Sequence, residues 1–197
     1  MDQFHDIRPY NDNEVVEVLE RLINTPDFIN TIISFRFPSW PQFMHKPLVM
    51  AVKWQLRRQL SNISDVYDFQ RRIAGYMERM IKTTTTSVEY RGVDKLEKGK
   101  GYLFISNHRD IAMDPAFINY GLYLSDFDTV RVAIGDNLLR RPFVSDLMRL
   151  NKSFIVKRSV AGVREMMAAF GQLSNYINHS ITEERCNIWI AQKEGRA

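Results

Sequence analysis

The chain has 197 residues, of which 45% are hydrophobic and 25% are charged, and its formal net charge is +4. A single cysteine, Cys186, excludes a disulfide framework and fits a reducing compartment, and no Cys/His spacing indicates a zinc site. No apolar run approaches the roughly 18 residues of a membrane-spanning helix, and the acidic, polar start is unlike a secretory signal, so we expect a cytoplasmic protein that could still lie peripherally on the inner face of the membrane.

The first 82 residues are predicted to form a helical region that packs on the rest of the chain. Asn11 and Glu14 have the spacing of a capping box, and apolar residues recur after them at helical intervals. Pro47 suits the first turn of a second helix, and a third helix is expected to open near Ser64.

Residues 28–44 combine five aromatic side chains with prolines that break any long helix. Aromatic residues of this kind suit a membrane interface. They equally suit a cover over a hydrophobic core, which we take as the first interpretation.

After Lys82 the periodicity changes. Residues 83–90 are rich in β-branched side chains and are expected to be extended. Short apolar runs at 101–107, 129–135, 153–158 and 186–192 predict strands, and helical patterns lie between them, one broken near Pro142 and one capped by Ser159. The alternation predicts an α/β fold for residues 83–197, with a mixed, mostly parallel sheet and flanking helices. Because the chain stops seven residues after Ile190, we expect this domain to be truncated at its C-terminus.

Positive charge is concentrated between residues 131 and 164, a stretch that contains eight Lys or Arg residues and only two acidic ones. Such a surplus favours an anionic partner, for example a phosphate ester, an acidic carrier protein or anionic lipid. A solvated basic surface explains it equally well. Nucleic acid is not expected as a partner, because the stretch has no recognition motif.

The segment FISNHRDIAMDP, residues 104–115, places His108 directly after a predicted strand, with Asp110 and Asp114 close behind. Ligands of α/β sheets gather at the carboxyl ends of strands, and a histidine there can accept a proton from an attacking hydroxyl when a carboxylate orients it. No G-x-S-x-G elbow is present, which favours direct attack by an acceptor hydroxyl. A plain helix start, with Asp114 as N-cap before Pro115, is the alternative.

SNHRDIAMDP resembles the His-to-Asp motif of the glycerolipid acyltransferases, the family of the glycerol-3-phosphate and lysophosphatidate acyltransferases. SFIVKR, with Arg158, resembles the family's second block, and IAQKEGRA resembles its third. The resemblance covers about residues 84–197. The family usually has four residues between His and Asp, whereas five separate His108 from Asp114 here, and the third block lacks the usual Pro and Thr.

The resemblance implies transfer of a fatty acyl group from a thioester donor, acyl-CoA or acyl carrier protein, to a hydroxyl of a glycerol-3-phosphate or lysophosphatidate type acceptor. It makes His108 the general base, with Asp114 as its carboxylate and Asp110 as the alternative. It assigns acceptor binding to Arg109, Arg158, Glu194, Gly195 and Arg196. The reaction needs no metal and no redox cofactor.

Two other functions stay open at this point. A non-catalytic module could bind anionic lipid or a carrier protein through the basic stretch, and that binding would weaken with salt. A thioester hydrolase could use the same His108 to activate water, and it would release thiol without an acceptor.

Overall fold

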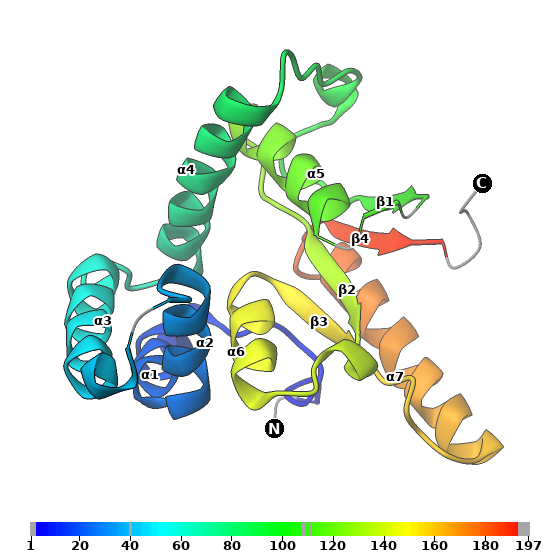
Figure 1. Cartoon of the computed structure of the whole chain (residues 1–197). Helices are drawn as coiled ribbons and strands as arrows, with labels where there is room; N and C mark the ends of the chain where they lie inside the picture. Colours follow the sequence, from blue (N-terminus) through cyan, green and yellow to red (C-terminus); the bar gives the residue numbers. More distant parts are fainter. Residues whose placement is uncertain (1–2, 40, 108, 111, 193–197) are drawn as a thin grey trace.

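A computed structural model describes residues 3–39, 41–107, 109–110 and 112–192 of the chain. Helices α1 to α4 come first, and strands then alternate with helices (Figure 1). The α-helices in the described part are α1 (Asp12–Asn24), α2 (Pro26–Arg36), α3 (His45–Leu60), α4 (Val66–Thr84), α5 (Met113–Leu124), α6 (Pro142–Leu150) and α7 (Val163–Thr182). The strands are β1 (Leu103–Ser106), β2 (Arg131–Gly135), β3 (Ser153–Val156) and β4 (Ile188–Ala191), and short 3-10 turns are η1 (Gln42–Met44), η2 (Val93–Lys95) and η3 (Asp136–Leu138).

The four strands form one sheet in the order β1-β4-β2-β3, and every pairing between them is parallel. β4, the last strand in the sequence, therefore lies between β1 and β2. The predicted α/β fold with an N-terminal helical region is confirmed, and among the described strands the sheet is entirely parallel.

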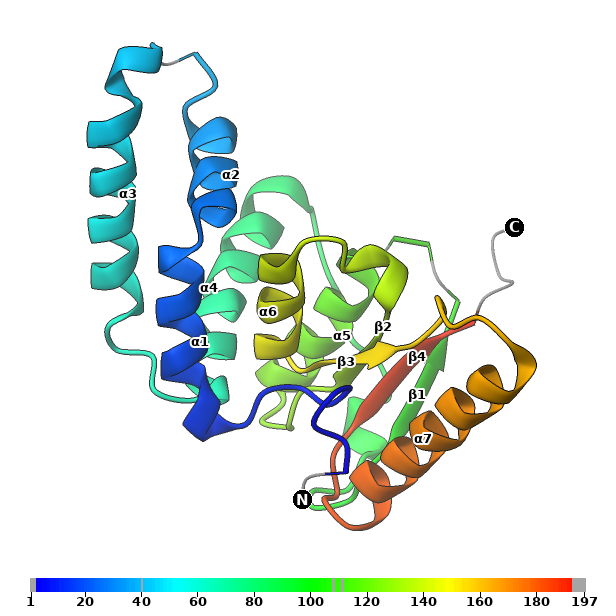
Figure 2. The same cartoon turned by 90° about the horizontal axis from the view of Figure 1, so that it is seen from below.

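Helices cover both faces of the sheet, as the side-chain alternation of β4 shows. Trp189 packs with Leu122 of α5, whereas its neighbour Ile188 packs with Tyr176 of α7. Successive side chains of a strand point to opposite faces, so α5 and α7 lie on opposite sides (Figure 2). The segment before α1 joins the α7 side, where the Ile155 amide donates to the Ile7 carbonyl at 2.8 Å.

The N-terminal helices share a hydrophobic cluster with α6. Val15, Leu19 and Phe69 from α1 and α4 pack against Phe143 and Leu150 of α6, and all five side chains are buried. The capping box also forms, since the Glu14 carboxylate accepts a hydrogen bond from the Asn11 amide at 2.7 Å. The apolar stripes predicted in this region are therefore the surface that binds it to α6.

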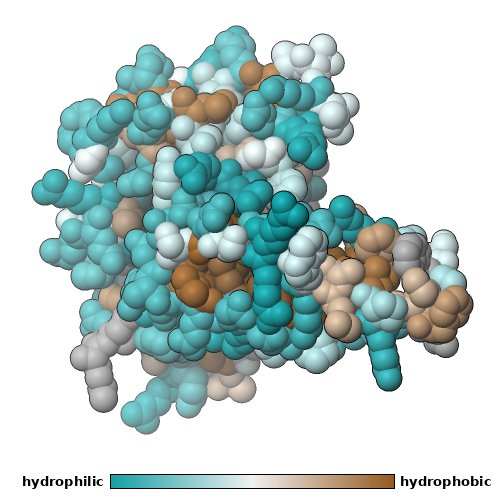
Figure 3. Space-filling model, turned by 90° about the vertical axis from the view of Figure 1, so that its left-hand side faces the viewer, coloured by the Kyte–Doolittle hydropathy of each residue, from teal (hydrophilic) through white to brown (hydrophobic). Residues whose placement is uncertain are grey.

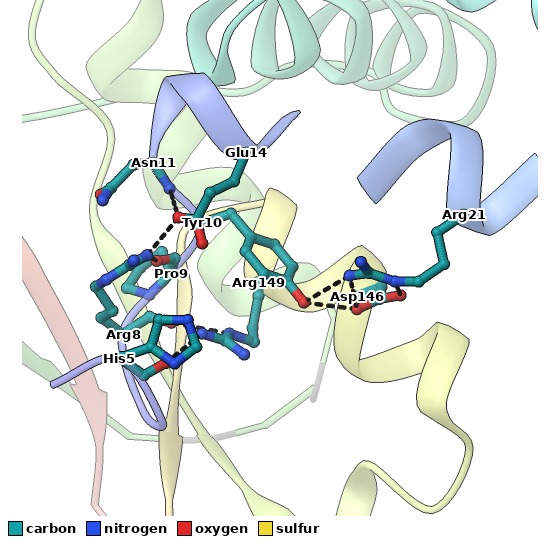
Figure 4. Close-up of polar contacts among 9 residues, drawn as sticks. All are labelled: His5, Arg8, Pro9, Tyr10, Asn11, Glu14, Arg21, Asp146 and Arg149. Carbon is teal, nitrogen blue, oxygen red and sulfur yellow. Dashed lines mark hydrogen bonds and ion pairs between the residues drawn. The ribbon is translucent and has the colours of Figure 1, made fainter. Parts of the chain in front are cut away.

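A polar network reinforces the same contact (Figure 4). The Asp146 carboxylate of α6 accepts a hydrogen bond from the Tyr10 hydroxyl at 2.6 Å and two from the Arg21 guanidinium at 3.0 Å each. Arg149 donates to the carbonyls of Arg8 and His5. Partial burial raises the pKa of the Asp146 carboxyl, but these donors outweigh it and hold the pKa below its ordinary value.

Two local predictions were wrong. Residues 83–84 continue helix α4, and the extended residues that follow pair with no strand in the described part of the chain. Ser159 does not cap α7, because its hydroxyl donates to Asp136 at 3.0 Å. Helix α7 begins after Gly162, whose φ of +99° is a conformation that glycine adopts readily and other residues rarely do.

Candidate active site

The parallel sheet brings the carboxyl ends of its strands to one edge. The loop 107–112 follows β1 there, the turn η3 follows β2, and residues 157–162 follow β3. β1 and β4 are locked together at this edge, since the Trp189 indole donates to the Ser106 hydroxyl at 3.1 Å and the Gln192 amide donates to the Ser106 carbonyl at 2.9 Å.

The two aspartates of the 104–115 motif have different contacts. One carboxylate oxygen of Asp114 accepts hydrogen bonds from the backbone amides of Arg109 and Asp110, at 2.7 and 3.0 Å. Asp110 instead accepts from the amides of Ala112 and Met113, at 2.9 and 2.7 Å, and so caps the start of α5. Asp114, from the first turn of α5, thus reaches back over the loop that follows β1.

The predicted base, His108, lies outside the described residues, and so do Glu194, Gly195 and Arg196. Arg109, next to His108 in the chain, is described and is exposed. The amide that the Asp114 carboxylate binds belongs to the peptide that joins residues 108 and 109.

Arg158 follows β3, and its side chain lies across the end of β2. A Cβ placed on Gly135, the last residue of β2, would stand 3.3 Å from both Cδ and Nε of Arg158 and 2.4 Å from Oδ1 of Asn137. A glycine at this position therefore leaves the room in which Arg158 and Asn137 lie.

Asp136 fixes the backbone that carries Arg158. Its two carboxylate oxygens accept hydrogen bonds from the amides of Arg158 and Ser159, at 3.0 and 3.1 Å. Desolvation raises the pKa of the Asp136 carboxyl, but the amide and hydroxyl donors together hold it below its ordinary value. The Asp136 carboxylate, which follows β2, thus holds the backbone of the loop that follows β3 in place.

The basic stretch 131–164 is not one surface. Lys157 pairs with Asp6 of the N-terminal segment and with Gln172 of α7, away from the side of Arg158. Arg131 is partly buried and bonds Glu184 and the hydroxyls of Tyr176 and Ser180. Much of the predicted patch therefore neutralises or satisfies groups inside the protein, because alternate strand residues face opposite ways.

A cavity of about 730 Å³ opens at this edge of the sheet. Its lining comes from β2, β3 and β4 and from helices α4, α5, α6 and α7, and most of it is apolar, for example Ile73, Met77 and Val144. At the strand ends its lining includes Ala112 from the motif loop and Arg158. Its volume lies within the range of small-molecule binding pockets.

The sheet order sets the span of this site. β1 and β3 are three strand spacings apart, which is roughly 14 Å at the usual 4.8 Å per spacing. Because the Arg158 side chain leans over Gly135 of β2, its charged end is nearer to the motif loop than β3 itself is.

Gly135, Asp136 and Asn137 were not predicted from the sequence as site residues. A signal was available, since Gly135 ends a predicted strand and the short polar residues Asp136 and Asn137 directly follow it, where ligand-binding loops occur. Among the described residues, no group of three or more His, Cys, Asp or Glu is arranged to hold a metal ion. None of the described helices is both long and apolar enough to cross a membrane.

Comparison with models of known protein families gives a match. The model of a protein family described as Acyltransferase matches residues 87–192, just over half of the chain. No curated protein matches the sequence. The matched range contains the motif loop, Asp114, Gly135 and Arg158.

Proposed function

The chain belongs to the acyltransferase family, the family of the glycerol-3-phosphate and lysophosphatidate acyltransferases, and from this we propose a specific reaction. A fatty acyl group passes from a thioester donor, acyl-CoA or acyl carrier protein, to a hydroxyl of a glycerol-3-phosphate or lysophosphatidate type acceptor. One observation carries the proposal: a single mostly apolar cavity is lined both by the motif loop, at Ala112, and by Arg158. An acyl chain needs the apolar part, and a phosphate needs the arginine.

In this proposal His108 is the general base. It removes the proton from the acceptor hydroxyl as the oxygen attacks the thioester carbonyl, and the imidazolium then returns a proton to the departing thiolate as the C–S bond breaks. The orienting carboxylate is Asp114 rather than Asp110. The support is that Asp114 binds the amide of the 108–109 peptide, whereas Asp110 is occupied at the start of α5.

The acceptor's phosphate is assigned to Arg158, with Arg109, Glu194, Gly195 and Arg196 as further contributors. A guanidinium binds two phosphate oxygens at once, which fixes both position and orientation. The side chain of Arg158 extends along the strand ends toward the motif loop, and a small glycerol phosphate could bridge the remaining distance.

The test is thiol release from a long-chain acyl-CoA, measured with glycerol-3-phosphate, with lysophosphatidate and with no acceptor. His108→Ala should abolish the acceptor-dependent rate. Arg158→Ala should raise the KM for the phosphorylated acceptor and leave the KM for acyl-CoA unchanged. Arg164→Ala, which removes an exposed arginine at the start of α7, is the matched control.

Three results would reject the proposal. Equal acceptor-dependent rates for the parent and His108→Ala would remove His108 as the base. A rate of thiol release that does not depend on the acceptor would indicate a thioester hydrolase. No thiol release with any donor, including acyl carrier protein, would favour a non-catalytic binding module.

A further inference from the structure

Helices α2 and α3 form a hairpin that projects from the body of the molecule (Figure 2). Its inner surface is a small cluster of its own, in which Ile29 and Ile33 of α2 are buried against Leu48 and Val52 of α3. The hairpin is joined to the protein mainly through α1. Its outer surface is therefore available to a partner.

Large apolar side chains lie on that outer surface. Phe35 is 91% exposed, Phe43 80%, Met50 73% and Trp54 64%. In Figure 3 the end of the hairpin protrudes at the lower right, and apolar side chains gather on it beside hydrophilic ones. The aromatic segment 28–44 is thus divided: Phe28 packs inward, as first interpreted, whereas Phe35 and Phe43 face solvent.

The same hairpin carries a surplus of positive charge, and its single acidic residue, Asp27, lies in the first turn of α2, directly after α1. From residue 28 to residue 64 there is no Asp or Glu, and there are five cations, Arg36, Lys46, Lys53, Arg57 and Arg58. Arg57 is 3.6 Å from Glu20 of α1. Within the described part of the chain, none of the other four has an acidic side chain at ion-pair distance.

The apolar and cationic side chains of α3 share one face. Met50 and Trp54 are four residues apart, so they lie one above the other on the helix, opposite the stripe of Leu48 and Val52 that contacts α2. The guanidinium of Arg58 lies over the Trp54 ring, 5.7 Å from its centroid. The Arg58 cation and the Trp54 ring are therefore exposed side by side on the same face of α3.

We propose that the α2–α3 hairpin is a docking surface for the anionic face of a lipid bilayer. Aromatic and methionine side chains insert at the boundary between headgroups and acyl chains, while lysine and arginine keep their charged ends among anionic headgroups. Beyond Asp27 at the start of α2, no acidic side chain follows for 37 residues, which gives the surface the charge complementarity that an anionic membrane requires.

The experiment is flotation of the full chain with vesicles of phosphatidylcholine alone and with about 30 mol% phosphatidylglycerol. The parent should bind the anionic vesicles, and less so as salt is raised. Phe35→Ser/Phe43→Ser should weaken binding at least about tenfold. Lys46→Gln/Lys53→Gln should weaken it by about fivefold per charge.

The matched control is Val163→Ser/Met167→Ser, which removes two exposed apolar side chains from α7 and should leave binding unchanged. A second readout uses brominated lipids, which should quench the emission of the parent more than that of Trp54→Phe, because that variant loses the exposed Trp54 and keeps Trp40 and Trp189, of which Trp189 is 2% exposed and lies in the core. The substituted side chains are exposed, apart from the partly exposed Lys53, and none lies in the core, so circular dichroism should show unchanged folding.

Several results would overturn the proposal. They are no binding to anionic vesicles, binding equal on neutral and anionic vesicles, or binding unaffected by the hairpin variants. Hairpin-dependent binding of acyl carrier protein without vesicle binding would also overturn it, since that outcome identifies an acidic protein as the partner. Acyl transfer to a soluble acceptor should be unchanged in the hairpin variants, which separates this proposal from the catalytic one.

Discussion

Asp114 offers the sharpest test of the site, because its charge and its hydrogen bonds can be removed separately. A single carboxylate oxygen accepts both amides, from Arg109 and Asp110. Asp114→Asn keeps one carbonyl oxygen in that place and loses the charge. Asp114→Ala loses both hydrogen bonds as well.

The geometry sets the expected magnitudes. In Asp114→Ala the two amides belong to exposed residues, so water can rehydrate them, and the free energy of unfolding should fall by only about 1–2 kcal/mol. In Asp114→Asn it should fall by less than about 1 kcal/mol. If the carboxylate orients the imidazole of His108 and stabilises its charged form, kcat should fall about 10²–10⁴-fold in both variants.

The assay pairs denaturant unfolding with acceptor-dependent thiol release, and Asp94→Asn, an exposed carboxylate in η2, is the control. The expected pattern is a stable but nearly inactive Asn variant. The reasoning is refuted if Asp114→Asn keeps the parental kcat while Asp114→Ala loses activity only in proportion to its loss of folded protein. Asp114 would then only stabilise the conformation of the loop and take no part in catalysis.

Three further predictions concern the phosphate site, the cavity and the N-terminal contact. Gly135→Ala should raise the KM for a phosphorylated acceptor severalfold with little change in melting temperature, because the added methyl displaces the Arg158 and Asn137 side chains rather than backbone; an unchanged KM would place Arg158 outside the site. Ala116→Phe should shift the preferred acyl-CoA to shorter chains, since Ala116 of α5 lines the cavity, and competition between donors of two lengths measures this; an unaltered preference would exclude this cavity as the acyl site. Asp146→Asn should lower the free energy of unfolding by about 1–3 kcal/mol at pH 7. The loss is limited to this range because Arg21 is 45% exposed and water screens its interaction with the carboxylate. Because the folded pKa of Asp146 is lowered, its contribution is present above the ordinary pKa and is lost as the pH falls through the folded pKa, so the difference between variant and parent should shrink below about pH 4.

The strands were predictable because parallel strands are buried on both faces and appear as short apolar runs. All four runs contain a strand, and the motif loop follows β1 as expected. The order of the strands was not predictable, since no local pattern specifies that β4 inserts between β1 and β2. That placement depends on long-range packing, chiefly of Trp189 against Leu122 and Val130.

The site was predictable in part for the same reason. The residues of one loop are visible in the sequence, whereas the clamp from Asp136 to the Arg158 amide joins loops that are 22 residues apart. The basic stretch 131–164 was wrongly expected to form one surface, because a charge count along the sequence does not show which way each side chain points. Lys157 and Arg158 are neighbours, yet Lys157 pairs with Asp6 and Arg158 lines the cavity. Aromatic content alone could not separate Phe28, which is packed, from Phe35, which is exposed.

The position of β4 couples the completion of the sheet to the assembly of the site. The motif loop follows β1 and the Arg158 clamp depends on β2, but β1 and β2 pair only through β4. The contacts that hold the motif strand at this edge, from Trp189 and Gln192 to Ser106, also come from β4 and the residue after it. The proposed base and phosphate site are therefore brought to their working distance only when residues 188–192 are in place. A substitution such as Trp189→Ala would therefore remove the hydrogen bond to Ser106 and the packing of β4 against Leu122, and would weaken the link between the two halves of the site even though both loops keep their own hydrogen bonds.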